Sequence, residues 1–153
     1  MKIKRFEEAY LADVIGLFRE TVRTINLADY SPEQVKAWAP DEIDHERWLT
    51  RLLDNYSIMM MEGETLCGFA ELHGGSHVHM MFVHKDHQRR GIASLLLADL
   101  EKIVHRLQET QLTADVSITA LPFFKSQGFA VVEKQQIEKD GQVLQNFEMK
   151  KKF

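Results

Sequence analysis

The sequence predicts a mixed fold of helices and strands (α/β in the broad sense, and α+β in detail), with about seven short strands and several helices. Three observations predict it. Apolar residues recur at helical spacing in the first third of the chain and again from Ile92 onward. Between these blocks lie β-rich runs separated by short turns that contain glycine or charged residues. The chain then closes with two further β-rich runs around one tight turn, which predicts a terminal hairpin.

The first third of the chain predicts one strand and three helices. Ile3–Phe6 is a short strand, and the helical spacing of apolar residues from Val14 to Ile25 predicts the first helix. Ser31–Gln34 starts a second helix, with serine as N-cap, proline at the first helical position and glutamine three residues beyond the cap. Pro40 ends it, and Asp44 can cap a third helix whose apolar stripe includes a tryptophan.

The middle of the chain predicts a three-stranded meander. Tyr56–Met61 and Thr65–His73 are joined by the turn at residues 62–64. Gly74-Gly75-Ser76 forms a second turn, and His77–Val83 is the third strand. These short turns predict antiparallel neighbours.

A long amphipathic helix, a strand, a short helix and the terminal hairpin complete the order. The long helix has its leucines and isoleucines on one face. Gly128 is suited to the C-cap of the short helix, and Asp140-Gly141 to the hairpin turn. The predicted bounds are Ile92–Leu107, Leu112–Ser117, Pro122–Gln127, Phe129–Ile137 and Val143–Met149.

Composition excludes several classes of function. With 153 residues, 44% hydrophobic, the chain is expected to form one domain over residues 1–153. A formal net charge of −4 argues against nucleic acid as a partner. No apolar run approaches the ~20 residues that span a bilayer, so no membrane partner is expected. The single cysteine, Cys67, fits a cytoplasmic location and indicates a small buried hydrophobe rather than a nucleophile.

The segment from Lys85 to Ala93 carries the clearest chemical signal. It joins a predicted strand to a predicted long helix, whose first-turn N–H groups have no intrahelical partner and can bind an anion. Gly91 and the small Ala93 let a bulky anion approach the backbone. Arg89 and Arg90 add forked donors suited to phosphate. The segment therefore predicts a pyrophosphate site, although it has neither the glycine–lysine spacing of a Walker loop nor the three glycines of a dinucleotide fingerprint.

Three strings resemble one family. Gln88–Ala93 (Gln-Arg-Arg-Gly-Ile-Ala) resembles the Gln/Arg-x-x-Gly-x-Gly/Ala signature of the GCN5-related N-acetyltransferases, the GNAT superfamily. Met80–Lys85 resembles its fourth strand, and Pro122–Phe129 its Phe-Tyr-x-x-x-Gly-Phe segment. The order of predicted elements is also that of the GNAT fold. Tyr30–Gln34 together with Trp38–Pro40 is similar to the YafP-like bacterial subgroup.

The resemblance implies a single central mixed, mostly antiparallel sheet with helices on both faces and strands four and five splayed apart. It implies an acetyl-CoA-dependent N-acetyltransferase that moves an acetyl group to a primary amine of a small molecule or to an exposed amino group, by direct attack in a ternary complex. The residues it places at coenzyme A are Met81, Phe82, Val83, Gln88, Arg89, Arg90, Gly91, Ile92, Ala93, Ser94 and Phe124.

The proton-transfer residues are less determined. Glu71 and His79, on neighbouring strands of the meander, are the candidates for the general base, and either can act through water. A solvated strand carboxylate and a satisfied sheet histidine are the structural alternatives. The family often uses the tyrosine of the Phe-Tyr pair as the acid, but this chain has Phe124, which leaves Ser117 or water to protonate the thiolate.

The acceptor side and two other functions stay open. Tyr30, Trp38 and His45 are candidate acceptor-binding residues. The missing tyrosine at Phe124 allows an alternative, a non-catalytic module that senses acyl-CoA. Five of the seven histidines lie in the segment 73–87, which suggests a metal-binding protein as a weaker alternative, but no third and fourth zinc ligand has suitable spacing. No metal is expected, and the chain is expected to be a monomer or a homodimer.

Overall fold

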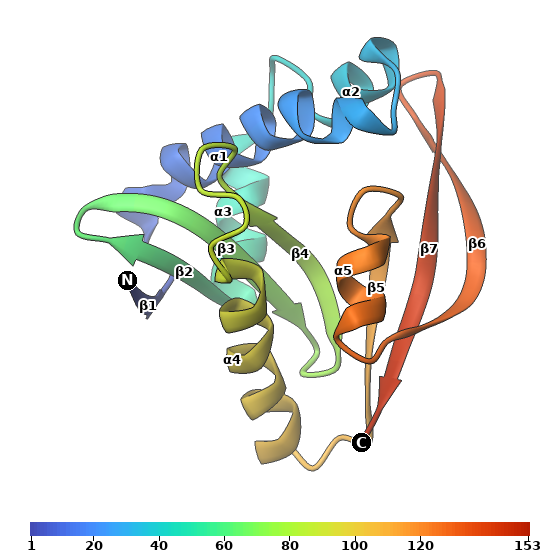
Figure 1. Ribbon diagram of the computed structural model, residues 1–153. Coiled ribbons are helices and arrows are strands. Elements are labelled where there is room, and N and C mark those ends of the chain that lie inside the picture. The colour runs from blue at the N-terminus through green and yellow to red at the C-terminus, as the bar shows by residue number, and fades with distance from the viewer.

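A seven-stranded sheet runs through the computed structural model, which describes residues 1–153, and its strand order is β1-β2-β3-β4-β5-β7-β6 (Figure 1). All predicted strands and helices are present, with ends that differ by a few residues. The strands are β1 (Lys2–Arg5), β2 (Tyr56–Glu62), β3 (Thr65–His73), β4 (His77–Val83), β5 (Gln111–Ser117), β6 (Ala130–Lys139) and β7 (Gln142–Lys152). The α-helices are α1 (Leu11–Thr24), α2 (Pro32–Trp38), α3 (His45–Asp54), α4 (Ile92–Arg106) and α5 (Leu121–Ser126).

The sheet is mixed because one pair of neighbours, β4 and β5, is parallel. Every other pair is antiparallel. The parallel contact is short, since only His77 pairs with Thr113 and Val78 with Ala114. Beyond these pairs the two strands diverge, and Figure 1 shows the opening between them. The expected splay of the fourth and fifth strands is therefore confirmed.

A β-bulge interrupts β4 close to the start of this opening. Leu72 of β3 pairs with Val78, but the next residue back along β3, Glu71, pairs with Met80. His79 is thus an extra residue without a partner on β3. Such a bulge bends a strand and increases its twist, which helps to turn β4 away from β5.

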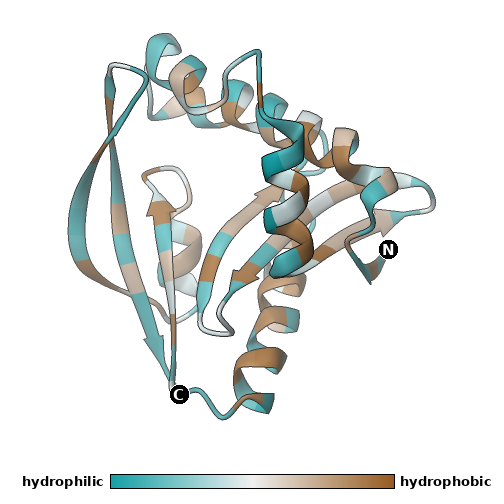
Figure 2. Ribbon diagram, turned by 180° about the vertical axis from the view of Figure 1, so that it is seen from behind, coloured by the Kyte–Doolittle hydropathy of each residue, from teal (hydrophilic) through white to brown (hydrophobic).

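Two apolar cores lie on opposite faces of the sheet. One is built around α4, where Leu96, Leu97 and Leu100 are fully buried. The other gathers the apolar side chains of α1, α2 and α3 against β2 and β3. Figure 2 shows the apolar residues concentrated in α4 and the central strands, whereas the β6–β7 hairpin is largely hydrophilic. The prediction of helices on both faces is confirmed.

The predicted helix starts are also confirmed. Ser31 accepts a hydrogen bond from the backbone N–H of Gln34, and the Gln34 side chain accepts one from the N–H of Ser31, which completes a capping box. Asp44 accepts from the N–H of Arg47 at the start of α3. The sequence pattern missed two short 3-10 helices, η1 (Glu8–Tyr10) and η2 (Asn26–Ala28), that flank α1. The second of these borders the site described below.

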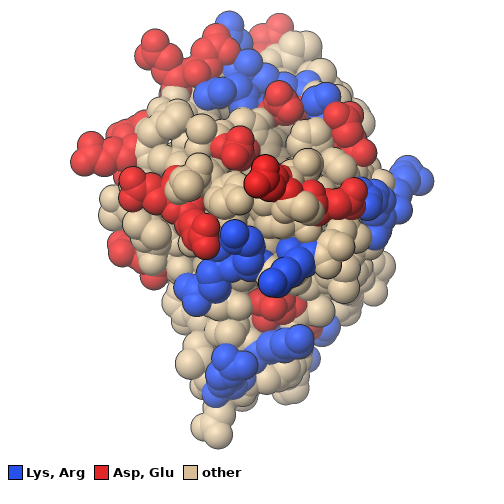
Figure 3. Space-filling model, turned by 90° about the vertical axis from the view of Figure 1, so that its left-hand side faces the viewer, with Lys and Arg blue, Asp and Glu red and all other residues tan.

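The surface chemistry agrees with the composition. Basic and acidic side chains are interspersed on the face shown in Figure 3. None of the helices has the length and apolar character needed to cross a bilayer. Cys67 is fully buried, as predicted, and burial raises the pKa of its thiol.

Candidate active site

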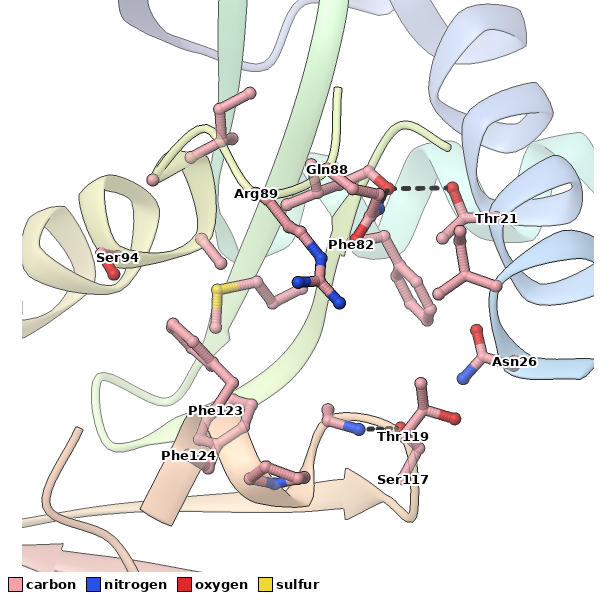
Figure 4. Close-up of a pocket in the computed structure, with 18 residues that line it drawn as sticks. Thr21, Asn26, Phe82, Gln88, Arg89, Ser94, Ser117, Thr119, Phe123 and Phe124 are labelled. Atoms are coloured by element: carbon pink, nitrogen blue, oxygen red, sulfur yellow. Dashed lines mark hydrogen bonds between the residues drawn. The ribbon is translucent and has the colours of Figure 1, made fainter. Parts of the chain in front are cut away.

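The opening between β4 and β5 leads into a cavity of about 460 Å³. Its walls come from β4, the loop before α4, the first turn of α4, the segment that follows β5, and the end of α1 (Figure 4). Eighteen residues line it, and among them only Arg89 is charged. The lining is Thr21, Ile25, Asn26, Met81, Phe82, Val83, Gln88, Arg89, Gly91, Ile92, Ala93, Ser94, Ser117, Thr119, Ala120, Pro122, Phe123 and Phe124.

The N-terminus of α4 opens into this cavity without a side-chain cap. Its N-cap is Gly91, at φ +78°, a conformation that glycine adopts without steric cost. A Cβ built on Gly91 would meet no atom within 4 Å, so the space beside the N-cap is open. Uncapped N–H groups of a 15-residue helix are donors for an anion. The loop geometry thus fits a pyrophosphate.

The two arginines of the loop point in different directions. Arg89 has φ +61°, which is uncommon for a residue with a side chain, and Figure 4 shows its guanidinium reaching into the middle of the cavity. Arg90 contributes no lining. Its guanidinium instead lies 2.5 Å from a carboxylate oxygen of Glu62 and 2.6 Å from Nδ1 of His87. The Arg90 side chain thus lies outside the cavity lining, because the β2–β3 hairpin supplies a carboxylate for it.

The backbone of β4 along the cavity is fixed by its neighbours. The N–H of His84 donates to the carbonyl of Cys67 on β3. The backbone N–H and C=O groups of successive residues in an antiparallel strand point alternately to one neighbour and to the other. Since His84 points its N–H to β3, the backbone groups of Met81 and Val83 point away from β3 and toward the opening. The carbonyl of Val83 accepts from the Thr21 hydroxyl at 3.1 Å and from the Gln88 amide at 2.7 Å. Gln88 therefore holds the loop against β4. The N–H groups of Met81 and Val83 remain free to donate to a ligand.

Aromatic rings close one side of the cavity. Phe123 and Phe124 both line it, with ring centroids 5.4 Å apart in an edge-to-face arrangement. Phe124 is only 5% exposed and also packs on Phe129, so it belongs to the α4-side core as well as to the cavity wall. Phe123 is not among the residues that the resemblance places at coenzyme A. Its position beside Phe124 in the matched string was the signal available.

The end of the cavity near α1 carries neutral polar groups. Ser117 accepts a hydrogen bond from the N–H of Ala120 at 3.1 Å and lines the cavity, as Figure 4 shows. The Thr119 hydroxyl oxygen is buried without a partner. Asn26 is 95% buried, and its amide forms no hydrogen bond within the chain. No sequence pattern indicated Asn26, because it lies in a short 3-10 helix without apolar periodicity.

Neither candidate for the general base lines the cavity. Glu71 is completely buried, so the alternative of a solvated strand carboxylate is wrong. One carboxylate oxygen accepts from Nε of Arg51 at 2.8 Å and from the Asn55 amide at 2.6 Å, and the other accepts from Arg51 at 3.2 Å. Both oxygens are occupied by donors from α3 and its C-cap.

His79 is the bulged residue of β4, and the charges of Glu71 and Arg51 both act on its pKa. Desolvation lowers its pKa, the Glu71 carboxylate raises it, and Arg51, His77 and His73 lower it further. The net shift is downward, so the imidazole is neutral over a wider pH range than in water. A neutral imidazole can accept a proton.

The three candidate acceptor residues do not line the cavity either. Tyr30 is buried, and its hydroxyl donates to the carbonyl of Gln145 and accepts from the N–H of Ile118, so it joins α2 to the strands beyond the opening. Trp38 packs edge-on against Tyr30 and Phe82. His45 is the exposed first residue of α3. The three side chains thus lie outside the cavity lining, and Tyr30 and Trp38 make packing and hydrogen-bond contacts within the fold.

The histidine-rich segment is held by other contacts. Nδ1 of His77 lies 2.7 Å from the Thr113 hydroxyl, and Nε2 lies 3.3 Å from Asp115. His84 and His87 pack edge-on, 5.2 Å apart between ring centroids. No three side chains of histidine, cysteine, aspartate or glutamate converge as metal ligands do. The segment thus shows no ligand set.

Comparison with known proteins decides the family. The sequence profile described as "Acetyltransferase (GNAT) domain" matches residues 26–152. The chain belongs to the GNAT acetyltransferase family. It is similar to a protein of Escherichia coli K12 named "Uncharacterized N-acetyltransferase YafP", with 33% identity over 152 residues that cover 99% of this chain and 96% of the relative. The chain is therefore an acyltransferase of an acetyl-CoA-dependent family, in agreement with the resemblance found in the sequence.

Solved structures agree with this assignment. A GCN5-related N-acetyltransferase from Rhodopseudomonas palustris superposes with a TM-score of 0.96 at 27% identity, covering 99% of this chain and 95% of that one. The PaiA N-acetyltransferase of Thermoplasma acidophilum, solved in complex with coenzyme A, superposes with a TM-score of 0.81 at 20% identity, covering 99% and 98%. The second comparison supports the GNAT fold alone.

Proposed function

We propose that this GNAT protein transfers the acetyl group of acetyl-CoA to a primary amine, on a small molecule or an exposed amino group, and that the cavity between β4 and β5 is where it does so. The observation that carries the proposal is the uncapped N-terminus of α4 opening into that cavity beside Arg89. The N–H groups from Gly91 to Ser94 are suited to the pyrophosphate of coenzyme A, and Arg89 adds positive charge. The PaiA N-acetyltransferase of Thermoplasma acidophilum, which has the same fold, was solved in complex with coenzyme A, and this supports coenzyme A as the ligand.

The free backbone of β4 supplies the next part of the site. The outward N–H groups of Met81 and Val83 can bond the amide-rich pantetheine arm in the way that a neighbouring strand would. One of them is suited to hold the thioester oxygen when it gains negative charge, an interaction worth about 3 kcal/mol in comparable sites. Phe82, Phe123 and Phe124 provide apolar walls, and such walls strengthen electrostatic interactions by excluding water.

For proton transfer, the two candidate bases on β3 and β4 differ in their surroundings. The lining contains no carboxylate and no imidazole. Both oxygens of Glu71 already accept hydrogen bonds, so Glu71 serves to hold Arg51 and α3 in place. His79, with its lowered pKa, is the better base, and it removes the proton of the acceptor ammonium through water. Ser117 is the one hydroxyl on β5 that faces the cavity, and it or water protonates the departing thiolate.

A thiol-release assay with a panel of primary amines tests this function. Acetyl-CoA is supplied, free thiol is followed, and the acetylated amine is identified by mass spectrometry. Turnover with at least one amine is expected, and calorimetry should show that coenzyme A binds with one site per chain. Failure of coenzyme A to bind the folded protein would refute the proposed site.

A second function, non-catalytic sensing of acyl-CoA, is favoured by one observation. The cavity carries no side chain with a proton that titrates near neutral pH, and Phe124 replaces the tyrosine of the family string. A sensor would bind acetyl-CoA as tightly as coenzyme A and leave the thioester intact with every amine. Turnover with any amine excludes it.

A further inference from the structure

The outer strand of the sheet, β6, has a free edge. It pairs with β7 on one side and is the last strand in the sheet order. Nine of its ten residues are exposed, and Figure 1 shows no element beyond it. An edge strand of this length presents a row of unpaired N–H and C=O groups that can receive another strand.

Two hydrogen bonds of β7 show which residues of β6 point their backbone groups outward. The carbonyl of Val143 accepts from the Gln34 amide, and the carbonyl of Gln145 accepts from the Tyr30 hydroxyl. Both carbonyls therefore face away from β6. Glu138 and Gln136 are the antiparallel partners of these two residues, so their own N–H and C=O groups face the free edge.

The alternation extends to Lys134. The register from Glu133 to Lys139 is continuous, because the bulge of β6 lies before it, between Val131 and Glu133. Lys134, Gln136 and Glu138 consequently present both backbone groups outward. The central part of β6 is a regular edge with three open pairing positions.

The charges on β6 are arranged symmetrically about Gln136. Glu133 and Lys134 lie on one side of it, and Glu138 and Lys139 on the other. All four side chains are exposed, and none takes part in an ion pair within the chain. If the strand is reversed about Gln136, each negative position falls on a positive one.

We propose that β6 pairs with β6 of a second copy of this chain, antiparallel and centred on Gln136, to form one continuous sheet across a twofold axis. In this register Lys134 lies opposite Glu138 of the second copy, and Glu133 lies opposite Lys139 of the second copy. Directly opposite charges of unlike sign stabilise an antiparallel pair. The outward backbone groups of Lys134, Gln136 and Glu138 meet their counterparts as hydrogen-bonded pairs.

Neighbouring registers lack this match. Centring on Gln135 places Glu133 opposite Ile137 and Lys134 opposite Gln136, without an ion pair. Centring on Ile137 pairs Lys134 with Asp140 but places Glu138 opposite Gln136. Charges of one sign normally keep an edge strand from pairing. Here the two signs are self-complementary, so the same charges select one register and one partner.

Sedimentation velocity of the full chain, over a range that reaches millimolar protein, tests the proposal. The wild type should sediment as a monomer–dimer equilibrium. Lys134→Glu places like charges opposite each other at both symmetric positions and should raise the dimer Kd about tenfold or more. Adding Glu138→Lys reverses both members of each pair and should restore the wild-type Kd. Lys102→Glu on α4, a helix that packs on β2 to β5, makes the same change in net charge away from β6 and should leave the Kd unchanged.

A backbone variant tests the pairing itself. Gln136→Pro removes an N–H that faces the free edge and makes no bond to β7, so the monomer should keep its circular dichroism spectrum while dimerisation is lost. A wild type that is monomeric at every concentration overturns the proposal. So does a dimer whose Kd is unaffected by Gln136→Pro. A double charge swap that does not recover the Kd lost in Lys134→Glu overturns the register.

Discussion

Replacing Gly91 by aspartate tests the anion site most directly. At this position a Cβ would meet no atom within 4 Å, so the substitution creates no clash in the fold. The cost to folding is the left-handed backbone, since φ is +78°, and it is about 1–2 kcal/mol for a residue with a side chain. Gly91→Ala carries the same backbone cost and serves as the matched control.

The effect on binding comes from charge. The aspartate carboxylate would lie in the space in front of the first-turn N–H groups, where the pyrophosphate is proposed to bind. Two unit charges about 4 Å apart at an effective dielectric constant of about 20 repel by roughly 4 kcal/mol. This corresponds to a rise of about a thousandfold in the Kd of coenzyme A.

Isothermal titration calorimetry measures the Kd, and thermal unfolding measures the folding cost. Gly91→Asp should lose coenzyme A binding while remaining folded, and Gly91→Ala should keep it within about tenfold, a change of about 1.4 kcal/mol. If folded Gly91→Asp binds coenzyme A as the wild type does, the anion does not sit at this helix end and the site assignment is wrong.

Four further predictions concern single side chains. Because the pKa of His79 is lowered, the kcat/KM of the wild type should rise with pH through a pKa below the ordinary histidine value. This rise should vanish in His79→Ala, and an unchanged profile would show that His79 is not the base. Phe124→Tyr should leave the coenzyme A Kd within threefold, about 0.7 kcal/mol, and raise turnover, whereas a loss of more than about 2 kcal/mol in unfolding free energy would place the new hydroxyl in the core. Arg51→Ala should cost about 3 kcal/mol in urea unfolding, since it leaves Glu71 buried without its cation, and a cost below about 1 kcal/mol would contradict the role given to this ion pair. Tyr30→Phe should cost about 1–3 kcal/mol by the same measurement, because the carbonyl of Gln145 and the N–H of Ile118 lose their partner, and an unchanged stability would mean that water replaces the hydroxyl.

Local sequence determined the elements and one end of the site. The capping box at Ser31 and the glycine before α4 depend on residues a few positions apart, so the sequence pattern contained them. The proposed anion site is of this kind too, because its donors would be consecutive N–H groups of one helix start. Arg89 and Gln88 follow from the same string, and both line the cavity.

Tertiary structure decided the direction of the long side chains and the state of the buried charges. Arg90 turns to Glu62 because the β2–β3 hairpin, 28 residues away in sequence, brings a carboxylate within reach. In the sequence Glu71 cannot be told from an ordinary strand carboxylate. Its ion pair forms only because α3 packs so that Arg51 donates to it. Tyr30 reaches Gln145 across 115 residues of chain. Such partners depend on how elements pack, and no local pattern encodes which of several nearby charges a flexible side chain will meet.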